Sequence, residues 1–292
     1  MSVEPPIDFL ERQEWLEPVE TATQKAVGSV FEGAGTAGRR IQDFLHGTWL
    51  GHPLHPVLTD VPLGAWTAAL VLDCADASGR KDCRSGADLA IRVGLAGAGL
   101  AAVAGLTDWH VTDGPARRVG IVHGMLNIIG AGLYAASLVA RQKRNRSAGR
   151  SLAFLGYAVA AASAYLGGNL VYAKQIGVNH TAAQPVPCDW TPVMDERDLP
   201  EGKLHRGEAN GVRVLLVLNA GHIRCISEVC SHLGGPLAEG RLSDDTVTCP
   251  WHGSIFSLDD GSVIHGPATH PQPCFETRVN GGRIEVKTRP QD

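Results

Sequence analysis

The chain divides into two regions by its pattern of hydrophobic and polar positions. Ala, Gly, Leu and Val dominate residues 57–173, which contain four long apolar runs, at 57–72, 89–106, 119–140 and 152–173. The C-terminal third instead alternates polar and apolar positions, with frequent Gly and Pro. The first pattern predicts four helices, and the second predicts an antiparallel β domain.

The four apolar runs approach the ~20 residues that a membrane-spanning helix requires. Asp60 in the first run and Arg92 in the second leave a buried soluble bundle as the competing interpretation. Four such runs joined by short polar connections favour the membrane. Small residues let helices approach closely in lipid, and glycines recur at positions 94, 97, 99, 120, 124, 130, 132, 167 and 168.

The predicted fold class is therefore an N-terminal four-helix transmembrane bundle followed by an all-β domain. Strand-like runs such as 212–218 and 283–287 alternate with Asn-Gly, Asp-Gly and Gly-Gly turns. For residues 1–45 a surface helix near the lipid is an alternative, and we prefer a loosely ordered arm. The predicted parts are a polar or amphipathic arm at 1–45, the membrane domain at 46–182, a stiff proline linker at 183–187 and the β domain at 188–292.

Two short motifs in the β domain carry the clearest chemistry. They read Cys230-Ser-His232 and, after sixteen intervening residues, Cys249-Pro-Trp-His252. A tetrahedral zinc site usually keeps Cys spaced with Cys and His spaced with His. Mixed Cys/His pairs instead suit a 2Fe-2S cluster in which one iron takes both sulfurs and the other takes both imidazoles. The spacing favours the cluster over zinc.

Three stretches resemble the cluster loops and the following proline loop of Rieske proteins: CSHLGGP at 230–236, CPWHGSIF at 249–256 and DGSVIHGPA at 260–268. The resemblance covers residues 188–289. It implies the Rieske fold of small antiparallel sheets, with Cys230, His232, Cys249 and His252 as ligands of a 2Fe-2S cluster.

The resemblance also bears on the reduction potential. The high-potential respiratory branch pairs two cysteines at the positions of Gly235 and Trp251 and places a Tyr hydroxyl at the position of Phe256. That branch also carries a serine in its second loop, and this chain keeps only that feature, as Ser254. The missing disulfide and hydroxyl predict a lower potential, nearer that of the ferredoxins that feed oxygenases.

The helical region resembles an uncharacterised four-helix membrane family over residues 46–175. The similar segments are HPLHP at 52–56, LTDVPLG at 58–64, DWH at 108–110 and HGMLN at 123–127. That family has no established activity, so the resemblance implies only the topology.

Histidines gather at the ends of the predicted spans that share a side with the β domain. His55 begins the first span and His123 lies about one turn inside the third, so the two imidazoles are predicted to meet between helices. Paired imidazoles there are candidates to ligate a haem b or bind a quinone. A structural role at the helix start is the competing interpretation.

Charge gives conflicting evidence on orientation. The net charge of −4 offers no general basic surface, so nucleic acid is not an expected partner. The loops far from the β domain are richer in Lys and Arg, which by the positive-inside rule would place the β domain outside. Five cysteines beyond the motif suit a reducing compartment, and the N-terminus has no signal-peptide core. We favour a multi-pass cell-membrane protein with a cytoplasmic β domain.

These observations predict a membrane-bound one-electron transfer protein. It would pass electrons between a membrane redox partner and a protein acceptor such as a reductase, an oxygenase or a respiratory component. It would be an electron-transfer component without its own substrate site. The alternatives are the ferredoxin component of a ring-hydroxylating oxygenase or reductase system, and a membrane redox sensor.

Overall fold

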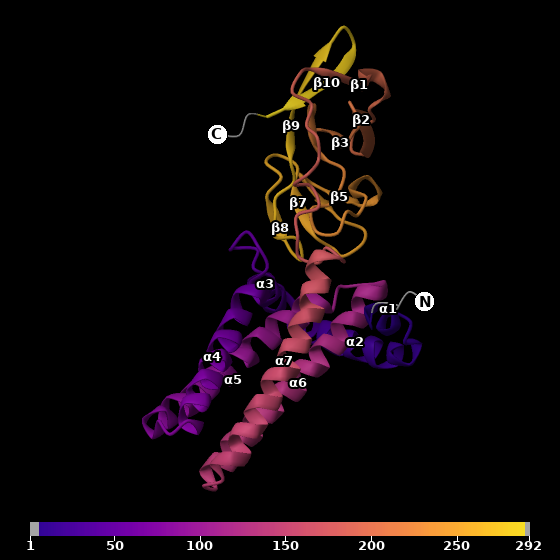
Figure 1. Cartoon of the computed structure of the whole chain (residues 1–292). Coiled ribbons are helices and arrows are strands. Elements are labelled where there is room, and N and C mark those ends of the chain that lie inside the picture. Colours follow the sequence, from indigo (N-terminus) through magenta and orange to yellow (C-terminus); the bar gives the residue numbers. More distant parts are fainter. Residues whose placement is uncertain (1–5, 290–292) are drawn as a thin grey trace, which may run out of the picture. The chain divides into compact units, whose positions relative to one another are not determined.

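The computed structural model describes residues 6–289, which fold into two compact units (Figure 1). The helical unit combines residues up to 38 with residues 53–176. The β unit combines residues 39–52 with the chain from 177 onward. This division differs from the predicted boundaries at 46 and 183, because residues 39–52 pack with the strands although they precede the first long helix.

The N-terminal stretch is helical where it is described, so the preference for a loosely ordered arm was wrong. Helix α1 is Pro6–Glu11, α2 is Glu17–Gly33, and α3 is Gly35–His46. Glu20 on α2 is fully buried and accepts hydrogen bonds from Nε of Arg117 at 3.0 Å and Nε of Arg118 at 3.3 Å. These charge-assisted bonds hold α2 against the bundle.

Four long helices follow, as the apolar runs predict. They are α4 (Leu54–Ala77), α5 (Arg84–Trp109), α6 (Gly114–Gln142) and α7 (Arg146–Tyr172), and each is long and apolar enough to cross a membrane. Large apolar side chains face outward from all four, with Val71, Leu100, Ile128 and Phe154 each more than 60% exposed. An exposed apolar surface around the whole bundle disfavours the soluble-bundle interpretation and indicates contact with lipid.

Glycines permit the close contact between α4 and α5. A Cβ atom added at Gly94 would lie 2.2 Å from Nε1 of Trp66, and one added at Gly97 would lie 2.6 Å from Cγ1 of Val61. Neither position has room for a larger side chain. The predicted role of glycine in helix packing is therefore met at these two positions.

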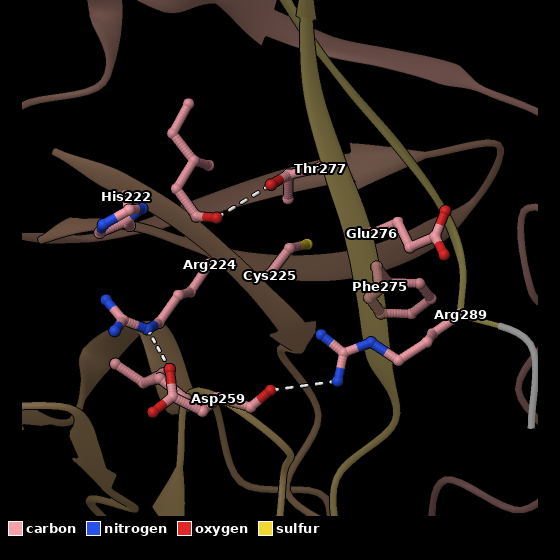
Figure 2. A pocket seen from close by; sticks show the side chains of 10 residues that line it. His222, Arg224, Cys225, Asp259, Phe275, Glu276, Thr277 and Arg289 are labelled. Atoms are coloured by element: carbon pink, nitrogen blue, oxygen red, sulfur yellow. Dashed lines mark hydrogen bonds and ion pairs between the residues drawn. The ribbon is translucent and has the colours of Figure 1, made fainter.

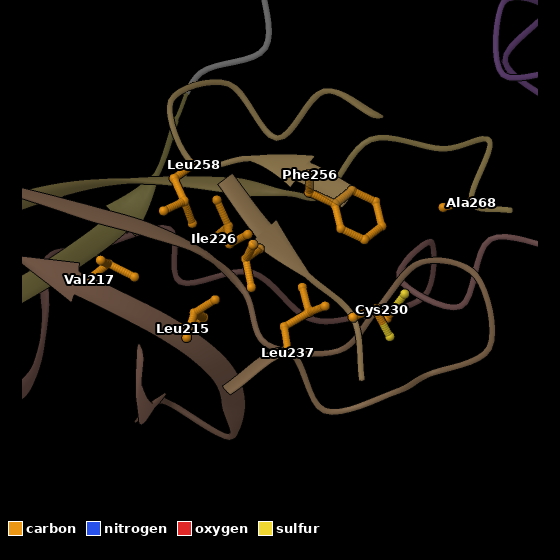
Figure 3. Packing of buried hydrophobic residues seen from close by; sticks show 10 residues of the cluster. Leu215, Val217, Ile226, Cys230, Leu237, Phe256, Leu258 and Ala268 are labelled. Atoms are coloured by element: carbon orange, nitrogen blue, oxygen red, sulfur yellow. The ribbon is translucent and has the colours of Figure 1, made fainter. Parts of the chain in front are cut away.

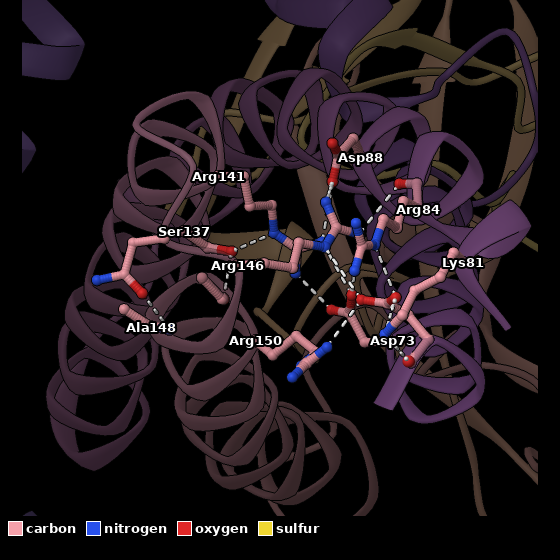
Figure 4. Close-up of polar contacts among 12 residues, drawn as sticks. Asp73, Lys81, Arg84, Asp88, Ser137, Arg141, Arg146, Ala148 and Arg150 are labelled. Carbon is pink, nitrogen blue, oxygen red and sulfur yellow. Dashed lines mark hydrogen bonds and ion pairs between the residues drawn. The ribbon is translucent and has the colours of Figure 1, made fainter. Parts of the chain in front are cut away.

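A network of ion pairs joins one end of all four long helices (Figure 4). Its acidic members are Asp73 and Asp76, which are buried on α4, and Asp88 on α5. Its basic members are Lys81, Arg84, Arg141, Arg146 and Arg150. Because the partners come from different helices, the network fixes the helix ends relative to one another.

The β unit contains two antiparallel sheets. The larger sheet has the order β1-β10-β9-β4-β3-β2, and the smaller has the order β5-β6-β7-β8. The bounds of the larger sheet are β1 Thr191–Asp195, β2 Leu204–Ala209, β3 Val212–Asn219, β4 His222–Ser227, β9 Cys274–Asn280 and β10 Arg283–Thr288. Those of the smaller are β5 Arg241–Ser243, β6 Thr246–Thr248, β7 Ile255–Ser257 and β8 Val263–His265.

Strand β3 is buried on both faces and separates two cores. Leu215 and Val217 enter one hydrophobic cluster, whereas Val214 and Leu216 enter the other, as the two-residue period of a strand requires. The first cluster also contains Phe256 and extends to the cysteines of the two motifs (Figure 3). The predicted strands at 212–218 and 283–287 are confirmed as β3 and β10.

Candidate metal centre

The two Cys/His motifs form two loops with the same backbone design. In the first, the Cys230 N–H donates to Gly235 O at 2.9 Å, and the Gly234 N–H donates to Cys230 O at 2.9 Å. In the second, the Cys249 N–H donates to Ser254 O at 2.8 Å, and the Gly253 N–H donates to Cys249 O at 3.2 Å. Gly234 and Gly253 each have φ +77°, which glycine adopts without a steric penalty.

The cysteines of the two loops meet each other at the edge of the hydrophobic core. Cys230 and Cys249 are only 1% and 3% exposed. The hydrogen bond between their thiols, together with burial, raises the pKa of Cys230, and the same hydrogen bond lowers the pKa of Cys249 to about 7. One loop thus presents its sulfur directly beside the sulfur of the other.

The histidines of the two loops also meet. The rings of His232 and His252 have centroids 5.0 Å apart and are nearly perpendicular. Burial, with a further contribution from the nearby His252, lowers the pKa of His232 to about 3. The ring is therefore neutral at physiological pH, which is the form that binds a metal.

The donor set fits a group that divides its ligands between two ions. Within residues 6–289, no three His, Cys, Asp or Glu side chains converge as a single-ion site would require. The described side chains instead offer a Cys pair and a His pair. Nδ1 of His232 is buried and has no hydrogen-bond partner, and a metal–nitrogen bond would satisfy it.

Gly235 and Trp251 lie against each other between the loops. A Cβ atom at Gly235 would lie 2.9 Å from Sγ of Cys249 and 3.1 Å from the Trp251 ring. These are the positions at which the respiratory branch is expected to carry its disulfide. The indole of Trp251, which is 56% exposed, occupies that place here.

Gly235→Ala should therefore lower the iron bound per chain and change the electron paramagnetic resonance (EPR) spectrum. Its added methyl group would force the loops apart, and overpacking of this kind costs about 1–3 kcal/mol. Gly132→Ala on α6 is the matched control, because its added Cβ would meet nothing within 4 Å beyond the backbone of its own helix and its chain neighbours. Unchanged iron content and spectrum in Gly235→Ala would contradict the close packing of the two loops.

Ser254 and Phe256 follow the second loop. The Ser254 side chain is fully buried, and its Oγ accepts a hydrogen bond from the Ala268 N–H at 3.0 Å. Its own hydroxyl proton remains available as a donor. Phe256 is also fully buried and packs in the hydrophobic core, so this position adds no hydroxyl to the site.

Residues 39–52 add contacts to this unit that the sequence motifs did not indicate. Asp43 Oδ1 accepts a hydrogen bond from the Gly266 N–H at 2.9 Å and pairs with Nδ1 of His265 at 2.7 Å. Burial opposes ionisation of Asp43, but these hydrogen bonds outweigh it and lower the pKa of the carboxyl. His46 is buried, and its Cδ2 lies close to Gly266. The distance in sequence hid these contacts.

His180 also contacts the first Cys/His loop. Its N–H donates to Ser231 O at 3.0 Å. Its imidazole and that of His46 both contribute to the lowered pKa of His232. In the sequence, His46 and His180 stood out only as two of several histidines near the ends of the predicted spans. That position gave no reason to assign them to the β unit.

The structure also brings His55 and His123 together within the helical unit, as predicted. Their ring centroids are 6.4 Å apart and their planes are nearly perpendicular. Each ring is half-buried. The contact makes them a candidate second site, separate from the Cys/His loops.

A pocket of about 350 Å³ lies elsewhere in the β unit, beside β4 and β9 (Figure 2). Asp259 pairs with Arg224 there, and its backbone carbonyl accepts a hydrogen bond from Arg289 at 3.2 Å. Burial raises the pKa of the Cys225 thiol at its wall. None of the four predicted ligands lines this pocket, so it adds nothing to the metal site.

Comparison with known proteins agrees with this geometry. Residues 189–276 match the Rieske 2Fe-2S domain, and residues 51–180 match a predicted membrane protein family, DUF2231. The 3-phenylpropionate/cinnamic acid dioxygenase ferredoxin subunit of Escherichia coli strain K12 is 38% identical over 90 residues, covering 30% of this chain and 84% of that protein. The chain belongs to the Rieske 2Fe-2S family. Its Rieske domain, which implies a 2Fe-2S cluster, is joined to a DUF2231 membrane domain.

Two further similarities have lower sequence identity. Human apoptosis-inducing factor 3 is 28% identical over 118 residues, covering 40% of this chain but only 20% of that protein. This chain thus matches about a fifth of its length. The ferredoxin of carbazole 1,9a-dioxygenase from Nocardioides aromaticivorans IC177 has 24% identity and a TM-score of 0.33, covering 34% of this chain and 98% of that structure.

Proposed function

We propose that the protein is a membrane-bound one-electron carrier. In this proposal Cys230 and Cys249 bind one iron of a 2Fe-2S cluster, and His232 and His252 bind the other. The observation that carries it is the pairing of like ligands, with the two thiols hydrogen-bonded and the two imidazole centroids 5.0 Å apart. When bound, such a cluster accepts and releases a single electron.

The protein residues set where and how easily the electron moves. The cysteines lie against the hydrophobic core, whereas Trp251 is exposed and His252 is partly exposed. A redox partner would approach from the side of Trp251 and His252. The hydroxyl proton of Ser254 would be available as a donor to a bound cluster, and a hydrogen bond of this kind would raise its potential.

The helical unit supports a membrane location for this carrier. Its role in the proposal is to anchor the Rieske domain near a membrane redox partner while a protein accepts or donates the electron. The similarity to a dioxygenase ferredoxin subunit favours a second candidate, in which the chain serves a ring-hydroxylating oxygenase or reductase system. Reduction by a purified ferredoxin reductase, followed by turnover of an oxygenase, would distinguish the second candidate.

The helical unit supplies a second redox site in this proposal. His55 and His123 would hold a haem b or a quinone head group, since their rings meet among helices that cross the membrane. An electron would then have one site in the lipid and one in the Rieske domain.

A redox titration of the detergent-purified full chain tests the principal proposal. The reduced protein should give a rhombic Rieske EPR signal with a midpoint toward the lower end of the known range, about −150 mV. The absence of a cysteine pair at Gly235 and Trp251 and the buried Phe256 are the reasons for this low value. A midpoint near +300 mV would contradict a ferredoxin-type carrier, and the absence of any Rieske signal would contradict both candidates.

We propose a cytoplasmic Rieske domain. The number of basic residues in and near the α4–α5 and α6–α7 loops argues against this orientation by the positive-inside rule. However, several of these residues pair with aspartates of the ion network, as Arg84, Arg141, Arg146 and Arg150 do. Helix packing thus explains their position without reference to membrane orientation. A reducing compartment also suits the five cysteines outside the two motifs, none of which forms a disulfide within residues 6–289.

Labelling of intact cells tests this orientation. Cys188 is exposed in the Rieske unit and Cys74 is exposed near the C-terminal end of α4. A membrane-impermeant maleimide should leave Cys188 unlabelled until the cells are permeabilised. Comparison with the Cys188→Ser and Cys74→Ser variants, each of which lacks one cysteine, shows which of the two residues carries the label. Labelling of Cys188 in intact cells would place the Rieske domain outside.

A further inference from the structure

The helical unit is a tandem repeat of two hairpins, α4–α5 and α6–α7. Residues recur at one constant offset from α4 to α6 and at another from α5 to α7, and both second helices begin with Arg-Ser. Because the hairpins follow each other in the same direction, the repeats are parallel and a pseudo-two-fold axis runs along the bundle. The corresponding pairs include His55 and His123, Trp66 and Tyr134, Asp73 and Arg141, Arg84 and Arg146, Gly94 and Gly156, and Gly105 and Gly167.

The two histidines make the same hydrogen bond in each repeat. Nδ1 of His55 lies 2.8 Å from Ala101 O, and Nδ1 of His123 lies 2.8 Å from Ser163 O. Ala101 and Ser163 correspond to each other in the repeat. A carbonyl oxygen can only accept, so Nδ1 carries the proton in both rings and Nε2 carries a lone pair.

A glycine in each repeat makes room for the imidazole. A Cβ atom at Gly105 would lie 2.8 Å from the His55 ring, and one at Gly167 would lie 3.1 Å from the His123 ring. Any larger residue would press on the imidazole at either position. Each repeat therefore holds its ring by a backbone hydrogen bond on one side and a close helix backbone on another.

Corresponding residues of the two repeats also meet each other. Trp66 stacks on Tyr134 with ring centroids 4.3 Å apart, and Arg141 donates to both carboxylate oxygens of Asp73. Residues that are related by a two-fold axis and touch each other lie on that axis. The histidine pair is thus one of three pairs along the pseudo-symmetry axis, where repeat proteins of the membrane place their ligand sites.

The separation of the two imidazoles suits one metal ion between them. Two metal–nitrogen bonds of about 2 Å, with about 1 Å from each nitrogen to its ring centre, place the ring centres about 6 Å apart. The observed distance is 6.4 Å. The Asn127 amide lies 3.1 Å from Nε2 of His123, as a donor to that lone pair would. A metal would take the place of this hydrogen bond.

Two imidazoles alone do not complete the coordination of an iron or zinc ion. Within the described residues no third His, Cys, Asp or Glu side chain joins His55 and His123 in a metal-binding group. The four nitrogens of a porphyrin would supply the remaining ligands. The two helices of each hairpin pack closely together, whereas the two hairpins pack less closely against each other. This arrangement favours a flat group between the hairpins.

We propose that His55 and His123 are the two axial ligands of a haem b held on the pseudo-symmetry axis of the helical unit. This inference rests on the proposed function in one respect, the exchange of single electrons. A haem iron gains or loses one electron, the same number that a Rieske cluster exchanges. The tautomer fixed by the carbonyls separates this site from a quinone site. A quinone carbonyl needs a hydrogen-bond donor, and Nε2 of a neutral Nδ1–H imidazole offers none.

The test uses the full chain, produced with added haem precursor and purified in detergent. We expect absorption bands of a six-coordinate haem b and about one haem per chain by pyridine haemochrome assay. His55→Ala and His123→Ala should each lower haem content by more than roughly tenfold, since each removes an axial ligand. His222→Ala is the matched control, because His222 is exposed and lies on β4.

Two further measurements guard against misfolding. His123→Met should retain haem with a changed spectrum, because a thioether replaces one imidazole ligand. The Rieske EPR signal should persist in all variants, so its loss would point to the proposed carrier function and not to the haem site. A full chain without haem, haem that survives both alanine variants, or a bound metal without porphyrin would overturn the proposal. So would a stoichiometric extracted quinone in place of haem.

Discussion

Cys249→Ala should abolish the Rieske EPR signal and reduce bound iron to near zero. The side chain is 3% exposed and its sulfur lies beside that of Cys230, so no water or other thiol can replace it without rearranging the core. In the proposed ligand set, this variant lacks one of four protein ligands and would leave one iron with a single sulfur from the chain. Iron analysis and low-temperature EPR of the purified chain measure the effect.

The matched control removes a thiol that lies outside the loops. Cys188→Ala changes an exposed cysteine of the same unit and should leave both iron content and signal unchanged. If Cys249→Ala kept the signal while Cys188→Ala lost it, the ligand assignment would be wrong. Circular dichroism of both variants checks that the helices remain, because the helical unit has its own core.

Arg141→Met should destabilise the helical unit strongly. The Arg141 side chain is 2% exposed, and its guanidinium donates to Asp73 and to Asp88 (Figure 4). Its Nε also donates to Oγ of Ser137 at 3.0 Å. Removing the cation leaves the buried Asp73 carboxylate without its main partner, and breaking a buried pair in this way costs about 3–5 kcal/mol. Thermal unfolding in detergent, followed by circular dichroism, measures the loss.

A double variant separates the ion pair from simple packing. Asp73→Asn combined with Arg141→Met should recover part of the stability, because no buried charge is then left alone. Arg80→Ala serves as the surface control, since Arg80 and its partner Asp82 are each 72% exposed and 3.9 Å apart. Equal losses in the single and double variants would show that the pair contributes only packing.

The two motifs of the metal site could be read from the sequence because each is contiguous. Cys230 and His232, like Cys249 and His252, are separated by only one or two residues, and the flanking glycines mark the turns that the loops need. The same local signals predicted β3 and β10 and the Asn210-Gly211 turn, where both residues have positive φ. Such features depend on neighbouring residues alone.

The residues around the loops could not be read in this way. Asp43 contacts Gly266 across more than two hundred positions, and nothing in their local sequences links them. The helical repeat was present in the sequence, but small apolar residues recur so often that it stands out only where His, Trp and Arg positions coincide. The structure showed that corresponding residues of the two repeats contact each other, which the repeat in the sequence did not reveal.

The two classes of secondary structure, the four long apolar helices and the loops with their Cys and His residues all followed from the order of residues along the chain, because hydrophobic period and turn chemistry act over short distances. The packing of residues 39–52 with the β unit and the contact of His55 with His123 became visible in the folded structure alone. Such contacts depend on how whole elements bury their surfaces against one another, which residue neighbours along the chain do not specify.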